Sequence, residues 1–120
     1  MNTLTRKKRT PPAPHTEAAI TKSIRDLLNQ FQIFHFKHWG GPMGQRGISD
    51  IIGCFAGVAL FLEIKTQNGR ISEQQQQFLN AANNNGALGV VIRSVDDAIE
   101  LVKGLKDGKD LSYLRDRFRS

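Results

Sequence analysis

The feature that most constrains this chain is an apolar stretch, residues 58–65, that ends in two charged residues. The stretch is apolar on both alternating faces until its end, which predicts a central strand covered on both sides. Glu63 and Lys65 are two residues apart and project from the same face of such a strand. Asp50 belongs to the preceding apolar run, 48–55. Burying these carboxylates is costly unless they are paired or bind a metal, so the pattern predicts a functional site.

Length and composition indicate one globular domain. The chain has 120 residues, of which 39% are hydrophobic and 23% charged, as in ordinary soluble proteins. It contains no apolar run of about 20 residues and no apolar secretory signal near its start, so we expect a cytosolic protein without a membrane partner. Cys54, the single cysteine, has no disulfide partner, and we expect it to be buried as a small apolar residue.

The positive charge is concentrated at the two ends of the chain. The net charge is +6, and the segment between the ends is neutral. We expect a flexible basic arm over 1–14, a globular domain over 15–105 and a charged tail over 106–120. The arm is either a solvated tail or a segment that contacts the phosphates of a nucleic acid, and these two interpretations are compatible. Its basic residues are Arg6, Lys7, Lys8 and Arg9.

The chain order predicts a mixed sheet flanked by helices. Apolar periodicity predicts a helix over 16–30, then strands over 33–39, 48–55 and 58–65, with Ala56-Gly57 as a tight turn between the last two. Ser72 and Gln75 match a capping box for a helix that ends near residue 85. A strand over 88–92, reached through that helix and therefore parallel to 58–65, precedes a helix over 95–104. The tail is expected to form a short helix, docked on the body or on a second subunit.

A glycine-rich loop over 40–47 follows the first strand. Its glycines permit close approach of a ligand to the backbone, and His38, Trp39 and Arg46 flank it. The loop is either a nucleic-acid contact or a plain connection between strands. Lys37 and Arg70 complete the set of expected DNA contacts.

The chemistry of the charged residues favours a hard cation. Oxygen ligands without cysteine or clustered histidine suit Mg²⁺ or Mn²⁺. Such an ion and Lys65 would offset negative charge in the transition state of phosphodiester hydrolysis. No small-molecule cofactor is expected.

Four motifs together resemble the virus-type replication-repair nuclease (VRR-NUC) domain of the PD-(D/E)XK superfamily. They are the segments 47–53, 61–65 and 71–78 and the following Gly86, and the resemblance covers roughly residues 15–103. It implies an α/β fold of restriction-endonuclease type, with an αβββαβ core, and a divalent-metal-dependent DNA endonuclease. Small stand-alone members of the family resemble phage proteins and tend to act as dimers on branched DNA such as Holliday junctions, so the likeness also implies a homodimer.

The resemblance also implies roles for individual residues. Asp50, Glu63 and the backbone carbonyl of Ile64 would be the metal ligands, and Lys65 would position the attacking water. Glu17 is either a first-turn acid that the helix dipole favours or the glutamate of the family's first helix. Gln75 is both a predicted cap and a match to the family's glutamine near the lysine. Ser49 stands where the superfamily has a proline, which carries no chemistry.

Two other interpretations remain open from the sequence. The chain could keep a nuclease fold as a catalytically silent DNA-binding or assembly protein. The charged residues could also be a structural salt-bridge cluster, although two acids and one base leave an uncompensated charge.

Overall fold

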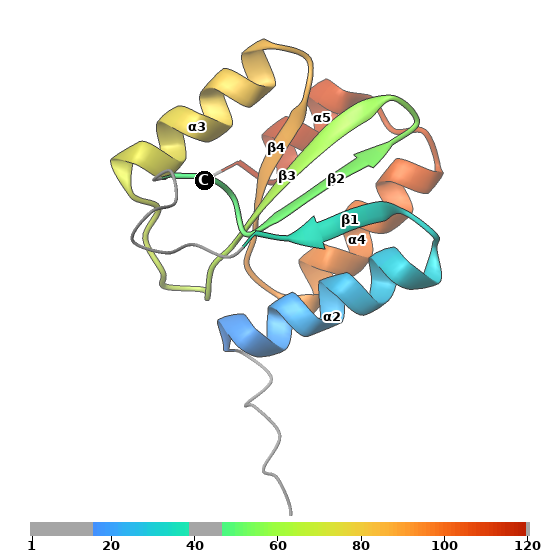
Figure 1. The fold of residues 1–120 in the computed structure, drawn as a ribbon, viewed down its shortest axis with the longest axis horizontal. Coiled ribbons are helices and arrows are strands. Elements are labelled where there is room, and N and C mark those ends of the chain that lie inside the picture. The colour runs from blue at the N-terminus through green and yellow to red at the C-terminus, as the bar shows by residue number, and fades with distance from the viewer. Residues whose placement is uncertain (1–15, 39–46, 120) are drawn as a thin grey trace, which may run out of the picture.

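The fold was described from a computed structural model, and the structure describes residues 16–38 and 47–119. The order of elements is the predicted one: a helix, three strands, a helix, a strand and a helix, with one more short helix at the end (Figure 1). Their bounds are α2 (Glu17–Gln30), β1 (Phe34–Lys37), β2 (Ile51–Phe55), β3 (Val58–Ile64), α3 (Glu73–Asn84), β4 (Leu88–Ile92), α4 (Val95–Lys106) and α5 (Leu111–Arg117).

The four strands form one mixed sheet in the order β1-β2-β3-β4. β2 is antiparallel to β1 and β3, and β3 is parallel to β4. Ala56 and Gly57 connect β2 to β3 with positive φ angles of 50° and 84°, the conformation of the hairpin turn that matches strand twist. The predicted αβββαβ core with a mixed, helix-flanked sheet is therefore confirmed.

The core lies between one face of the sheet and the helices α2, α4 and α5. Ile24 and Leu28 of α2, Leu62 of β3 and Leu101 of α4 are fully buried there. Caps define the helix starts: Thr16 Oγ1 accepts a hydrogen bond from Ala19 N at 3.1 Å, which satisfies a free donor of the first turn. This packed face holds the sheet, and the residues at its edge, in a fixed position.

The opposite face of the sheet is covered over only part of its width. Within the described residues α3 packs there on β3 and β4, with Phe78 edge-on to Phe61 at 5.2 Å between ring centroids. Over β1 and β2 no described element covers the same face, and Phe34 and Phe36 are 69% and 48% exposed. The prediction that the strand 58–65 is covered on both sides is confirmed for the second half of β3 but wrong at its start, where Ala59 is exposed.

The expectation that Cys54 is buried is also wrong. Cys54 is exposed, because it pairs with Phe34 across the ladder and so shares the open face. Alternation along a strand predicts which residues share a face, but the cover on that face depends on where a distant helix packs.

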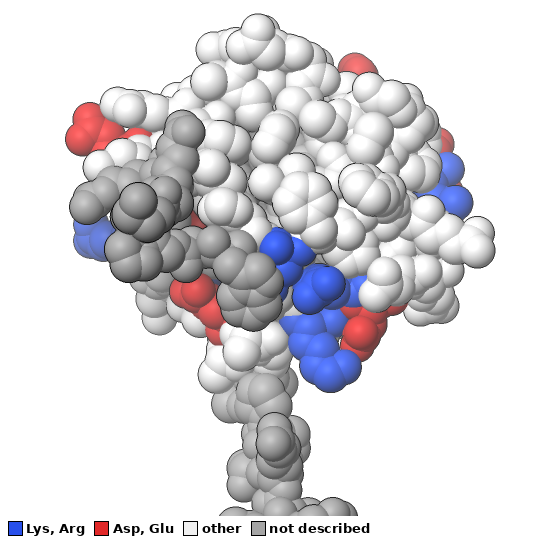
Figure 2. All heavy atoms as spheres, in the orientation of Figure 1, with Lys and Arg blue, Asp and Glu red and all other residues white. Residues whose placement is uncertain are grey.

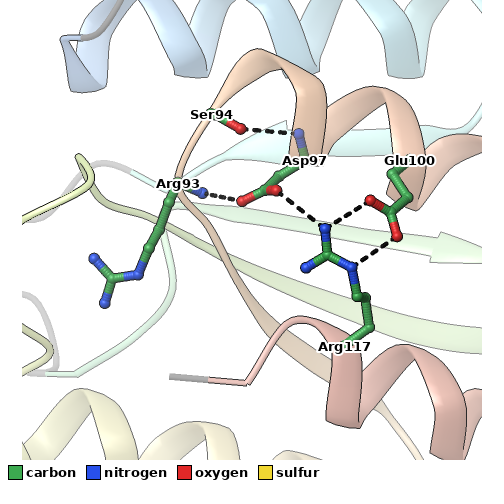
Figure 3. A network of polar contacts seen from close by, with 5 residues as sticks. All are labelled: Arg93, Ser94, Asp97, Glu100 and Arg117. Carbon is green, nitrogen blue, oxygen red and sulfur yellow. Dashed lines mark hydrogen bonds and ion pairs between the residues drawn. The ribbon is translucent and has the colours of Figure 1, made fainter.

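The C-terminal tail docks on the body of the same chain. Leu114 and Phe118 are buried, and Arg117 makes a two-pronged ion pair with Glu100 of α4, at 2.7 and 2.8 Å. Figure 3 shows Arg117 also reaching toward Asp97, which accepts a hydrogen bond from Arg93 N.

No helix in the described part of the chain is long and apolar enough to cross a membrane.

Candidate active site

Asp50 stands where the β2–β3 ladder ends. The last paired residues are Ile51 and Leu62, so a continued register would place Ile64 opposite Ser49. Instead, Asp50 Oδ2 accepts the hydrogen bond of Ile64 N at 2.8 Å. The Asp50 side chain thereby takes the place of the backbone group of Ser49 as the partner of Ile64 N, and the Asp50 carboxylate lies against the end of β3. As a result β2 begins at Ile51, three residues later than predicted.

Glu63 is the buried charge of the site. It is only 2% exposed and lies on the face of the sheet that α3 covers. Its Oε2 accepts a hydrogen bond from Gln75 Nε2 at 3.0 Å, whereas Oε1 is buried and has no hydrogen-bond partner among residues 16–38 and 47–119. Burial, and then the neighbouring charge of Asp50, raises the pKa of Glu63 to about 8.

Gln75 connects the start of α3 to Glu63. Its Oε1 accepts from Ser72 N at 2.9 Å, and its own N–H donates to Ser72 Oγ at 3.1 Å, which completes the predicted capping box. The amide Nε2 is then directed at the carboxylate. One side chain thus caps α3 and donates a hydrogen bond to Glu63.

Lys65 and Glu17 complete the charges around Glu63. The positive charge of Lys65 lowers the pKa of Glu63, against the larger effects of burial and Asp50, and the negative charge of Glu17 raises it slightly. Lys65 is half-buried just beyond β3, and Glu17 is exposed in the first turn of α2. Glu63 is thus near enough to Asp50, Lys65 and Glu17 for their charges to shift its pKa.

A cavity of about 620 Å³ opens beside Asp50. One wall is the polar side of α2, and Lys37 at the end of β1 contributes to the other. Figure 2 shows basic side chains gathered in this region, below a broad area without charges. The residues that line the cavity are Glu17, Ala18, Thr21, Lys22, Arg25, Asp26, Asn29, Lys37 and Asp50.

The donor set fits a hard divalent cation. The described residues contain no group of three or more His, Cys, Asp and Glu that could hold a metal, so two carboxylates would need a further oxygen. The carbonyl of Ile64 adjoins Glu63 in sequence, and Mg²⁺ usually keeps several waters as ligands. Glu63 Oε1 has no partner by geometry in the described part of the chain, and a hydrogen bond between the Glu63 and Asp50 side chains helps to raise the pKa of Glu63. The two carboxyl groups therefore share a proton when no cation is present, and a cation would take the place of that proton.

The overall fold of this chain is similar to that of a solved structure described as "VRR_NUC domain". The TM-score is 0.64 at 20% sequence identity, and the match covers 73% of this chain and 96% of the other. This chain has the VRR_NUC fold. The resemblance predicted from the four motifs is confirmed at the level of the fold. No protein-family model matches the sequence, and no curated protein matches it.

Within this VRR_NUC fold the residues expected to bind DNA are dispersed. Lys37 lines the cavity, His38 donates its N–H to the carbonyl of Asp50 at 2.8 Å, and Arg70 is exposed after β3. The others lie outside the described residues: Arg6, Lys7, Lys8, Arg9, Trp39 and Arg46.

Two residues near the site were missed by sequence reasoning. Arg25 lines the cavity, and the signal that could have found it is its place on the polar side of the first helix, two turns after Glu17. Arg93 Nη1 donates to the carbonyls of Thr66 and Gly69 at 2.8 and 2.7 Å and so holds the turn that follows Lys65. No local pattern predicts that contact, because it joins the ends of two strands.

Proposed function

We propose that this chain is a Mg²⁺- or Mn²⁺-dependent DNA endonuclease. The observation that carries the proposal is the buried Glu63 carboxylate, which lies beside Asp50 and is oriented by Gln75 through one oxygen while the other has no partner in the described part of the chain. Asp50, Glu63 and the carbonyl of Ile64 would hold the cation. A bound cation would lower the pKa of a water and offset charge on the phosphate.

The residues of the chain divide the remaining work. Gln75 fixes the orientation of the Glu63 carboxylate, and the Asp50 carboxylate is fixed by its bond to Ile64 N. Lys65, on the same face as Glu63, would orient the attacking water and stabilise the developing negative charge. Glu17 adds a carboxylate at the mouth of the site. The basic segment 1–14, outside the described residues, would hold the DNA through its phosphates, and residues 15–105 would form the nuclease domain.

The test is cleavage of labelled DNA with Mg²⁺, Mn²⁺ or EDTA. We expect Glu63→Gln and Lys65→Ala to lose about 100-fold or more in rate, and EDTA to abolish cleavage by the wild type. Glu73→Gln and Lys103→Ala are the matched controls, since both residues are exposed. Equal cleavage by the site variants would show that the site is assigned wrongly. A wild type that binds DNA but never cleaves it would indicate a catalytically silent nuclease fold.

We further propose that the enzyme acts as a homodimer that selects branched DNA, such as a four-way junction. A chain of 120 residues offers little surface with which to grip a duplex, and two sites related by a two-fold axis suit a symmetric junction. The open apolar face of β1 and β2 supports self-association. Cleavage of junction, flap, linear and single-stranded substrates tests the selectivity, and equal cutting of all four by a monomer contradicts it.

A further inference from the structure

We infer that Arg25, with Asn29, forms a subsite for a backbone phosphate of the DNA strand about three nucleotides from the scissile bond, and that Lys37 binds a phosphate between the two. The inference rests on the proposed nuclease function and extends it, since it assigns the path of the strand away from the metal-binding carboxylates. Arg25 and Asn29 belong to none of the motifs that predict the active site.

The cavity runs from the acidic site along α2. Glu17 lies in the first turn of the helix, and Arg25 lies eight residues later on the same cavity wall. At a rise of about 1.5 Å per residue this separation is roughly 12 Å along the helix axis. One strand of duplex DNA has a phosphate for about every 3.4 Å of axis. With the duplex axis parallel to α2, as this inference requires, a strand cleaved beside Asp50 would present its third or fourth phosphate to Arg25.

Lys37 lies nearer the acidic site. The residue after it, His38, donates its N–H to the carbonyl of Asp50, so the end of β1 is held beside the carboxylate. Lys37 and Asp50 both line the cavity. Lys37 would therefore meet a phosphate between the scissile one and the phosphate at Arg25.

Arg25 is the basic residue of α2 that is best placed to bind a phosphate. Lys22 already pairs with Asp26 at 2.9 Å. Arg25, in contrast, forms no ion pair in the described part of the chain, and its buried Nε has no hydrogen-bond partner there. A guanidinium binds phosphate with paired, planar N–H donors. Because Arg25 lines the cavity, a rotation of its side chain would present these donors to a phosphate.

The distribution of surface charge agrees with this path. Figure 2 shows Lys and Arg side chains gathered over α2 and the end of β1, with acidic side chains beside them, whereas the sheet face above them is uncharged. Among the acids of α2, Asp26 is paired with Lys22. A polyanion gains from neutralised phosphates only where cations lie. The strand would therefore follow the rim formed by α2 rather than cross the open sheet.

The first experiment measures binding without cleavage. The affinity of full-length Glu63→Gln protein for a fluorescein-labelled four-way junction would be determined by anisotropy over a range of salt concentrations. Adding Arg25→Ala should weaken binding about tenfold and reduce the slope of log K against log salt by about one. Adding Arg25→Lys should keep the slope, and Lys103→Ala on α4, outside this cavity, should change neither quantity.

The second experiment locates the phosphate. Single methylphosphonate substitutions, which remove one charge each, would be placed at successive positions from the cut. The substitution at the third or fourth position should weaken binding by protein with Arg25 and have no further effect with Arg25→Ala. Arg25→Gln preserves the length of the side chain and serves as the loss variant if alanine loosens α2, which far-UV circular dichroism would reveal.

The outcomes separate the inference from the proposed function. If the wild type cleaves DNA but Arg25→Ala leaves the slope of log K against log salt unchanged, the subsite is overturned and the proposed nuclease function stands. A reduced slope in a protein that never cleaves DNA supports the subsite and overturns the nuclease. A protein that binds no DNA overturns both.

Discussion

At the scale of single residues, Glu63 connects stability to function. Burial raises the pKa of this carboxyl to about 8, so without a cation it is largely protonated at neutral pH. A cation between Glu63 and Asp50 requires the charged form, and its binding releases a proton. The same burial that makes the carboxylate costly in the free protein makes it a strong ligand once a cation is present.

The raised pKa predicts the pH dependence of stability without divalent ions. In the folded state Glu63 retains its proton up to about pH 8, whereas in the unfolded chain it loses the proton near the ordinary glutamate pKa of 4.5. The unfolded state then binds fewer protons, so the free energy of unfolding falls as pH rises from about 4.5 to 8. We expect a loss of a few kcal/mol from this group, measured by urea denaturation in EDTA at several pH values.

Glu63→Gln is the control for this prediction, because it keeps the shape of the side chain and removes the titration. The variant should lose most of the decline in stability between pH 5 and pH 8. A decline of equal size in Glu63→Gln would show that other groups cause it.

The sequence predicts the residues whose roles follow from strand and helix spacing. Asp50 and Glu63 follow from charges within apolar strands, and Gln75 from a capping box. Arg25 does not follow, because an arginine on a polar helix face looks like any solvated residue until a strand end lies opposite it. Arg93, between β4 and α4, does not follow because its partners Thr66 and Gly69 lie 27 and 24 residues away in sequence. Cys54 was mispredicted for a related reason: its exposure depends on how far α3 extends over the sheet.

At the scale of elements, the approach to Asp50 depends on close contact between the chain before it and α3. Gly47 has φ of +84°, and a Cβ at that position would lie 2.7 Å from the backbone oxygen of Gln74. The segment that leads to Asp50 therefore passes directly against the first turn of α3, which also carries Gln75. This contact sets the position of the aspartate relative to the glutamine.

Gly47→Ala should accordingly be more harmful than Gly86→Ala. Both glycines have positive φ, and at Gly86, with φ of +91°, an added Cβ would meet nothing within 4 Å. Gly86→Ala should cost about 1 kcal/mol for the backbone conformation alone, and Gly47→Ala should cost at least 1 kcal/mol more because backbone must move. Thermal unfolding measures the difference, and cleavage should fall in Gly47→Ala only. Equal stability of the two variants would contradict the argument.

The order of elements was predictable, but some of their ends were not. Apolar periodicity and caps predict α2, α3 and β4 closely, because these signals are local. β2 begins at Ile51 rather than residue 48, since the Asp50 side chain takes the place of a ladder bond. α5 packs on β4 through the buried Leu114 and Phe118, and the exposed ion pair of Arg117 with Glu100, 17 residues apart in sequence, adds to this contact. Periodicity shows the apolar side of α5 but not the surface on which that side packs.

At the scale of the whole molecule, the open face of β1 and β2 is the surface best suited to a second copy of the chain. Phe34 and Phe36 lie there with their rings 6.4 Å apart, beside the exposed Cys54. A stable dimer buries about 800 Å² on each partner, and the two rings, which are 69% and 48% exposed, can supply roughly 200 to 300 Å² of that area. The apolar neighbours Ile52 and Ala59, on the same face, would add to it.

Replacing both phenylalanines by serine should therefore dissociate the dimer and leave the fold intact. We expect sedimentation equilibrium to show a dissociation constant at least about 100-fold weaker for the double variant, because each ring is exposed in the single chain and adds little to its core. Tyr113→Ser is the control, since Tyr113 is a similarly exposed aromatic residue, at 51%, on α5. The Cys54 thiol should react slowly with a thiol reagent in the wild type and rapidly in the double variant. A wild type that sediments as a monomer at tens of micromolar, and whose Cys54 thiol reacts rapidly, would exclude this surface as an interface. Two independent monomers would then have to cleave a junction.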